Sequence, residues 1–116
     1  MSKENIIQNK SYEFALKIIK VYKDLKFNKK EYDLSRQLLR SGTSIGSNIE
    51  EGIGGQSKKD FIAKFQIALK EARETHYWCR LLTDSEILDN QVGKDLINNC
   101  EELIKIPTSI LKSSKL

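Results

Sequence analysis

Few residues of this 116-residue chain could carry out acid–base or nucleophilic chemistry. His76 is the single histidine, and no residue near it in the sequence marks it as the base of a nucleophile pair. The adjacent acids Glu50 and Glu51 do not make a catalytic pair, because neighbouring side chains of a helix point about 100° apart. We therefore predict no catalytic residue, no enzymatic activity, and a structural, hydrogen-bonded role for His76.

The two cysteines, Cys79 and Cys100, fall on different predicted helices. We expect their levels along the two helices to differ by several ångströms, which is too far for a relaxed disulfide. The sequence therefore predicts two buried thiols. With one histidine and no closely spaced pair of cysteines, it predicts neither a zinc site, nor another metal, nor a cofactor.

The glycines and lysines between Gly52 and Lys59 invite comparison with a phosphate-binding loop. The spacing differs from that of a P-loop, and no strand precedes it. The free amides of a helix that begins near Lys58, beside Lys58 and Lys59, could instead hold one phosphate of a nucleic-acid backbone. The alternative is ordinary capping, in which the Ser57 hydroxyl accepts a hydrogen bond from the amide of Asp60.

Basic residues are concentrated near the beginning of the chain. The formal net charge is +4, and residues 1–31 contain eight lysines against four acids. Because phosphate contacts dominate the affinity of proteins for nucleic acids, such clustering is typical of a surface that binds the phosphate backbone. A solvated lysine surface without a ligand is the alternative. The residues predicted to contact phosphates are Lys10, Lys17, Lys20, Arg36 and Arg40, together with Lys58 and Lys59.

These residues would be positioned by helices. Apolar residues recur with helical periodicity over residues of about 3–26, 31–51, 58–84 and 91–112, and no segment alternates as a strand does. We predict an all-α fold with a single domain: an antiparallel, up-down-up-down four-helix bundle with left-handed packing. Pro107 should kink the last helix or make it restart near Ile106, because proline lacks an amide donor and clashes with the preceding turn.

Glycines mark two features of the second predicted helix. Gly42 and Gly46 lie beside its apolar stripe, and since a glycine inside a helix costs about 1 kcal/mol relative to alanine, they indicate a close approach by a neighbouring helix. Gly52, Gly54 and Gly55 should then end the helix, through the left-handed conformation that glycine adopts easily.

The third predicted helix carries a second apolar stripe, formed by Ala63, Ile67, Trp78 and Leu81. A monomeric bundle would show mainly charged residues on this side, so the stripe predicts a contact surface for self-association. The alternative is that the chain ends, or the loop after Asp84, cover it.

No membrane association is expected. The sequence contains no apolar run long enough to span a bilayer and no signal-peptide pattern. We therefore expect a cytoplasmic protein.

Three segments carry a family resemblance: SIGSNIEEGIG over residues 44–54, SKKDF over 57–61 and IALKEARET over 67–75. Over nearly its whole length the chain resembles the bacterial 23S ribosomal RNA intervening-sequence proteins. The resemblance implies an antiparallel four-helix bundle without an established enzymatic role. A related branch contains the accessory variability protein of diversity-generating retroelements, a basic ring of five bundles that associates with a reverse transcriptase and nucleic acid. It therefore implies a homo-oligomer, with a pentamer as the size known in that branch.

The residues that match the family motif are structural. The resemblance implies that Asn48, Glu51, Gly52 and Gly54 pack and cap the junction between the second and third helices, followed there by Ser57 and Asp60. We expect the Asn48 side chain to reach a loop amide or a neighbouring helix. Gln56 departs from the pattern, since many members have arginine there, and this removes a charge from the place where a phosphate could bind.

Two functional hypotheses follow. The first is a non-enzymatic bundle that self-associates and binds RNA or another nucleic acid through its basic face, without reading the base sequence. The second is a protein-interaction or scaffold module that binds a protein partner through the stripe on the third helix and does not bind nucleic acid.

Overall fold

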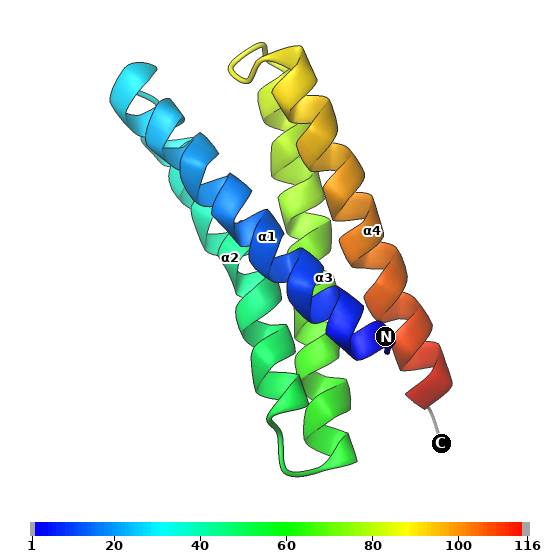
Figure 1. Cartoon of the computed structure of the whole chain (residues 1–116). Helices are drawn as coiled ribbons and strands as arrows, with labels where there is room; N and C mark the ends of the chain where they lie inside the picture. The colour runs from blue at the N-terminus through cyan, green and yellow to red at the C-terminus, as the bar shows by residue number, and fades with distance from the viewer. Residues whose placement is uncertain (1, 115–116) are drawn as a thin grey trace.

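The computed structural model describes residues 2–114 and contains four long helices: α1 (Lys3–Lys23), α2 (Asp33–Ile53), α3 (Lys58–Asp84) and α4 (Asn90–Ser114). One π-helical turn, η1 (Asp24–Asn28), continues α1. Each helix runs antiparallel to the one before it, and residues 2–114 contain no strand (Figure 1). The predicted all-α, up-down-up-down bundle is confirmed. Relative to the predicted bounds, α2 begins and ends two residues later, and α4 begins one residue earlier and ends two residues later.

Each helix contributes one buried row to a common core. α1 and α3 lie on a diagonal, and each packs against both α2 and α4. The largest fully buried apolar side chains come from all four helices and from η1: Ile7, Phe14, Ile18, Leu25, Leu38, Ile45, Ile49, Phe65, Leu82, Leu96 and Leu103. The helical spacing of apolar residues predicts such a buried row on each helix.

The α1–α2 contact depends on Gly42. A Cβ atom on Gly42 would lie 2.8 Å from Cγ1 of Ile18, closer than carbon atoms can approach. The predicted close approach is therefore confirmed at this position. Gly46 is in looser contact, because a Cβ there would be 3.4 Å from the nearest atoms of Ser11.

The turn between α2 and α3 is closed by glycines in an unexpected conformation. Gly54, at the end of α2, has a φ of −80°, and no glycine within residues 2–114 has a positive φ. The left-handed ending predicted for Gly52, Gly54 and Gly55 is therefore wrong. Instead, the Gly54 amide donates to the Glu50 carbonyl and the Gly55 amide to the Gly52 carbonyl, which closes the turn without a positive φ. Ser57 begins α3 as predicted, and its hydroxyl accepts from the Asp60 amide at 3.0 Å.

Gly52 has a packing role in that turn. It is buried, and a Cβ atom on it would lie 2.8 Å from a ring carbon of Phe65. Glycine at this position therefore lets α2 contact an aromatic ring of α3.

Pro107 lies inside one continuous helix. α4 runs from Asn90 to Ser114 without a break, so of the two predicted alternatives, a kink or a restart near Ile106, the restart is wrong. The Pro107 ring is buried in the bundle, and this packing offsets the missing amide hydrogen bond. The helix continues directly beyond it, where the Thr108 hydroxyl donates to the Ile104 carbonyl at 2.6 Å.

Cys79 and Cys100 are both buried and both free, as predicted. The reason given for that prediction was wrong, because the two side chains are in contact and not several ångströms apart in level. A hydrogen bond with Cys79, followed by burial, raises the pKa of the Cys100 thiol well above its ordinary range.

The bundle is closed tightly at one end and open at the other. α1 and α4 lie together near the chain termini and diverge toward η1 and the α3–α4 turn (Figure 1). A cleft of 680 Å³ lies between the diverging halves, with Val21 and Leu96 among the residues that line it. Within residues 2–114, no helix combines the length and the apolar character needed to cross a bilayer.

Candidate nucleic-acid interface

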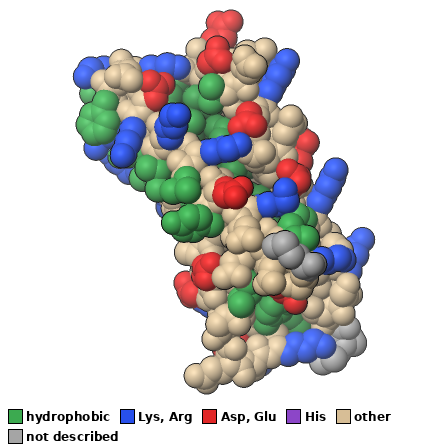
Figure 2. Space-filling view, viewed as in Figure 1, with side chains coloured by type: hydrophobic (Ala, Val, Ile, Leu, Met, Phe, Trp, Pro, Cys, Tyr) green, Lys and Arg blue, Asp and Glu red, His purple; other side chains and the backbone are tan. Residues whose placement is uncertain are grey.

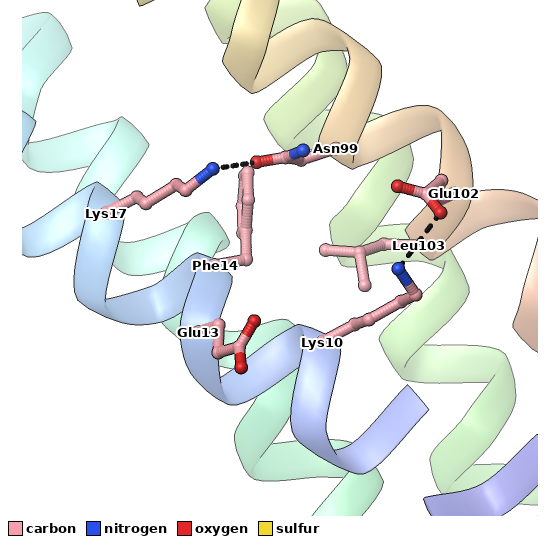
Figure 3. A pocket seen from close by; sticks show the side chains of 7 residues that line it. All are labelled: Lys10, Glu13, Phe14, Lys17, Asn99, Glu102 and Leu103. Atoms are coloured by element: carbon pink, nitrogen blue, oxygen red, sulfur yellow. Dashed lines mark hydrogen bonds and ion pairs between the residues drawn. The ribbon is translucent and has the colours of Figure 1, made fainter. Parts of the chain in front are cut away.

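Two of the predicted phosphate contacts, Lys10 and Lys17, lie along the contact between α1 and α4 and are paired there. Lys10 forms an ion pair with Glu102 at 3.1 Å (Figure 3). Lys17 contacts Asp95 at 3.0 Å and Asn99 at 2.9 Å. The two lysines flank a small pocket of 80 Å³, well below the roughly 300 Å³ at which ligand pockets begin. Their charges therefore hold α1 to α4 and are already compensated.

Arg40 is held in the same way between α2 and α3. Its guanidinium contacts Glu71 at 3.3 Å and also pairs with Glu74. Glu71 keeps only 15% of its side chain exposed, and Glu74 also accepts from the indole nitrogen of Trp78 at 3.0 Å. Arg40 is therefore built into the bundle, one turn along α2 from the exposed Arg36.

Lys58 and Lys59 lie at the opposite end of the molecule from Lys20 and Arg36. They are exposed at the start of α3, where the bundle turns back from α2 (Figure 1). Near them, Glu51 forms an ion pair with Lys64 at 2.9 Å, and this contact raises the pKa of Lys64. The seven predicted cations therefore do not form one continuous surface.

A different group of basic residues gathers where α1 ends and α2 begins, and we call it the lysine–aromatic end. Residues 20–36 contain six basic and three acidic side chains. Among residues 2–114, none of the six basic groups has a carboxylate within ion-pair distance. Figure 2 shows basic and hydrophobic side chains side by side over this end, at the upper left. Its members are Lys20, Lys23, Lys26, Lys29, Lys30 and Arg36, with Tyr22, Phe27 and Tyr32.

Aromatic rings are part of this surface. Phe27 is 59% exposed and Tyr32 is 49% exposed. The ammonium group of Lys26 lies 5.4 Å from the Phe27 ring centre and 5.7 Å from that of Tyr22. Large exposed rings beside cations are the arrangement that single-stranded nucleic acids contact, by stacking of bases and pairing of phosphates.

Helix register brings α2 into the same surface. Ile18 lies against Gly42, and Gln8 donates to Glu50 at 3.0 Å. Residues of α1 and α2 whose numbers add up to about sixty therefore lie at the same height along the bundle axis. Arg36 is therefore level with Lys23. The sequence prediction included Lys20 and Arg36 but missed the lysines and rings between them, although the interleaving of Tyr22, Lys26, Phe27 and Lys30 was a readable signal.

His76 lies at the surface between α3 and α4 with 21% of its side chain exposed. Its Nε2 atom is 3.4 Å from a carboxylate oxygen of Glu101. Within residues 2–114, no cluster of histidine, cysteine and acidic side chains could hold a metal ion.

The apolar stripe of α3 is only partly covered. Ile67 and Leu81 are 41% and 37% exposed, and Ala63 is exposed as well. Trp78 is half-buried and packs against the core. A second exposed apolar row runs along α1 through Tyr12, Leu16 and Ile19.

The Asn48 side chain donates to the Ser44 carbonyl of its own helix at 2.8 Å, so the expected contact with a loop or a neighbouring helix is wrong. An asparagine side chain can donate a hydrogen bond to a backbone carbonyl one turn earlier in its own helix. This local hydrogen bond competes with contacts to other segments.

Comparison with known proteins identifies relatives of this bundle. A family model described as 23S rRNA-intervening sequence protein matches residues 3–109. This chain is also similar to a crystal structure of a protein of unknown function from the S23 ribosomal protein family of Bacteroides thetaiotaomicron VPI-5482. The two sequences are 46% identical, and the match covers 96% of this chain and 99% of the other. The two structures superpose with a TM-score of 0.93. A search among curated proteins found no match.

Proposed function

The chain belongs to the 23S rRNA-intervening sequence protein family, and we propose that it binds the phosphate backbone of single-stranded RNA through the lysine–aromatic end. The observation that carries this proposal is the contrast between two sets of cations. Lys10, Lys17 and Arg40 already have carboxylate partners, whereas the six basic groups of the lysine–aromatic end have none within residues 2–114.

Electrostatics favours that end over the paired lysines. A phosphate that approaches Lys10 or Lys17 must compete with Glu102 or Asp95 for the ammonium group. A phosphate at Lys23 or Lys30 displaces only water and counter-ions, and release of counter-ions is the main source of affinity for nucleic acids. The exposed rings of Phe27 and Tyr32 add base stacking, which is worth about 1–3 kcal/mol per base and tolerates any sequence.

Two lysine pairs, matched in charge, test the proposal. Binding of a labelled single-stranded RNA would be measured by fluorescence anisotropy over a range of salt concentrations. We expect Lys23→Gln/Lys26→Gln to weaken binding and to reduce the slope of log affinity against log salt by about 1.4, or about 0.7 per lost contact. Lys10→Gln/Lys17→Gln removes the same charge from paired residues and should change the slope little. A wild type that does not bind RNA at low salt, or equal losses in the two variants, would contradict the proposal.

We also propose that the protein self-associates. Two exposed apolar rows support this: Tyr12, Leu16 and Ile19 on α1, and Ala63, Ile67 and Leu81 on α3. Because α1 and α3 lie on a diagonal of the bundle, the rows face different directions. A row of one copy that packs against the other row of the next copy makes a heterologous contact, which closes into a ring when the rotation permits. Such a ring would repeat the lysine–aromatic end around its circumference.

A scaffold module that binds only proteins is the second candidate function. The same apolar rows favour it, since either could contact a different protein in place of a second copy. The two candidates differ in the RNA titration, because a scaffold module would show no salt-dependent RNA binding.

A further inference from the structure

A second set of basic residues lines a groove between α3 and α4. Two adjoining hollows of 530 and 460 Å³ share Arg73, Ile104 and Lys105, so they form one continuous groove along these helices. Its cations are Arg73 and Arg80 on α3 and Lys105 and Lys112 on α4, and all four are exposed. We call this surface the α3–α4 groove.

The ion pairs elsewhere in the bundle explain why this groove is positive. Glu71 and Glu74 of α3 turn toward Arg40 on α2, and Glu102 of α4 turns toward Lys10 on α1. Within residues 2–114, no carboxylate lies within ion-pair distance of the four cations of the groove.

Glu101 is the acid that lines the groove, and it is already engaged. Its carboxylate lies 3.4 Å from the Nε2 atom of His76, between the levels of Arg73 and Arg80. The groove therefore has four cations against the one carboxylate of Glu101 and is a net basic surface.

The spacing of the cations suits an extended polyanion. Arg73 and Arg80 are seven residues apart, as are Lys105 and Lys112, which separates each pair by about 10.5 Å along its helix. His76 is level with Glu101 and Thr83 with Gly93, so Arg73 and Lys105 lie at one level, with Arg80 and Lys112 beyond them in opposite directions along the groove. A small anion would meet only part of this set, whereas a chain of phosphates that follows the groove can contact all four. The guanidinium groups add paired donors that match phosphate oxygens.

An acidic helical peptide fits the groove less well. Peptide helices dock through apolar anchors inserted into a hydrophobic groove. The apolar side chain that lines this groove is Ile104, which is already half-buried. Recognition here would thus depend on charge, as in contacts with a nucleic-acid backbone.

We propose that the α3–α4 groove is a second, independent site for a nucleic-acid backbone, so that one chain holds two RNA segments at once. The inference rests on the proposed RNA-binding function. The two sites lie on different pairs of helices: the lysine–aromatic end belongs to α1, η1 and α2, and the groove to α3 and α4. A protein with two such sites brings separate strands, or distant parts of one strand, close together.

The number of short RNA strands bound per chain tests this proposal, and this number does not depend on self-association. Single-stranded RNA of about eight nucleotides, within the range that one small binding surface covers, would be titrated calorimetrically at low salt. We expect two strands per chain for the wild type. Arg73→Gln/Lys105→Gln and Lys23→Gln/Lys26→Gln should each reduce this to one, and the variant with all four changes should bind none. Thermal unfolding by circular dichroism checks that these substitutions leave the fold intact.

The outcomes separate the two proposals. If the wild type binds one strand and only Lys23→Gln/Lys26→Gln removes it, the groove proposal is wrong and the proposed function stands. If the wild type binds none, both are wrong.

A helical peptide with glutamates seven residues apart is the competitor. If the peptide binds the groove and RNA does not displace it, the groove is a peptide site and the proposal is overturned.

Discussion

Gly42 of α2 lies against Ile18 of α1 with no space for a side chain between them. A Cβ atom on Gly42 would stand 2.8 Å from Cγ1 and 3.0 Å from Cγ2 of Ile18, and Ile18 is itself fully buried. This contact sets the distance and the register between the two helices. It therefore also determines that Arg36 is level with Lys23 in the lysine–aromatic end.

Gly42→Ala should destabilise the protein. The added methyl group forces Ile18 to move in a filled core, at a cost of about 1–3 kcal/mol, and the better helix propensity of alanine offsets about 1 kcal/mol of this. We expect a net loss of up to about 2 kcal/mol in the free energy of unfolding, measured by urea denaturation. Gly46→Ala is the matched control. Its Cβ atom would be in ordinary contact at 3.4 Å, so it should be neutral or stabilising. Equal losses in both variants would contradict the assigned role of Gly42.

The sequence predicted this contact but not its equivalent between α3 and α4. Gly42 lies on an obvious apolar stripe, so an unfavourable helix residue there indicates a neighbour. Gly93 is the closer contact, because a Cβ atom there would lie 2.0 Å from the Thr83 hydroxyl oxygen. Gly93 lies three residues after the start of α4, where a glycine can also be explained as part of the preceding turn. Only the distance between two packed helices distinguishes the two roles.

Arg40 and Arg36 should separate stability from RNA binding. Arg40→Ala leaves Glu71 and Glu74 close together without their cation, so we expect a loss of about 1–2 kcal/mol in the free energy of unfolding. High salt should reduce this loss by screening the two carboxylates. Arg36→Ala, one turn away, should leave stability unchanged and weaken RNA binding. Urea denaturation at two salt concentrations and RNA titration of both variants check this, and the reverse assignment would refute it.

The difference between these arginines was not available from the sequence. Both lie on the outer side of α2, and the partners of Arg40 are more than thirty residues away on α3. The pairing of Lys10 and Lys17 could not be predicted from the sequence either, since their partners Glu102 and Asp95 lie on α4. Charge clustering along the chain indicated which segment carries the excess of lysines. The helix packing that decides which charges remain unpaired depends on contacts between distant segments.

The Cys100 thiol should make stability depend on alkaline pH. The hydrogen bond with Cys79, followed by burial, raises its pKa in the folded protein, whereas a thiol in the unfolded chain has a pKa of about 8.5. The unfolded chain therefore loses this proton first, and the stability contributed by the thiol is complete below about pH 8.5 and falls as the pH rises above it. Between pH 8 and 10, the wild type should lose about 2 kcal/mol more than Cys100→Ala. Urea denaturation under reducing conditions measures this, and parallel pH curves would contradict it.

The exposed row of α3 should control self-association. Ile67→Glu and Leu81→Glu place charges on side chains that are 41% and 37% exposed, so the folded monomer should tolerate them while an apolar contact between copies would not. Trp78→Glu is less informative, because Trp78 packs against the core and its indole donates to Glu74. We expect light scattering coupled to size-exclusion chromatography to show an oligomer for the wild type and a smaller species for both variants. Val92→Glu, equally exposed at 41% but on α4, should keep the wild-type size. A monomeric wild type would refute self-association, and an oligomer that survives both α3 substitutions would place the contact on another surface, with the Tyr12 and Leu16 row of α1 as the next to change.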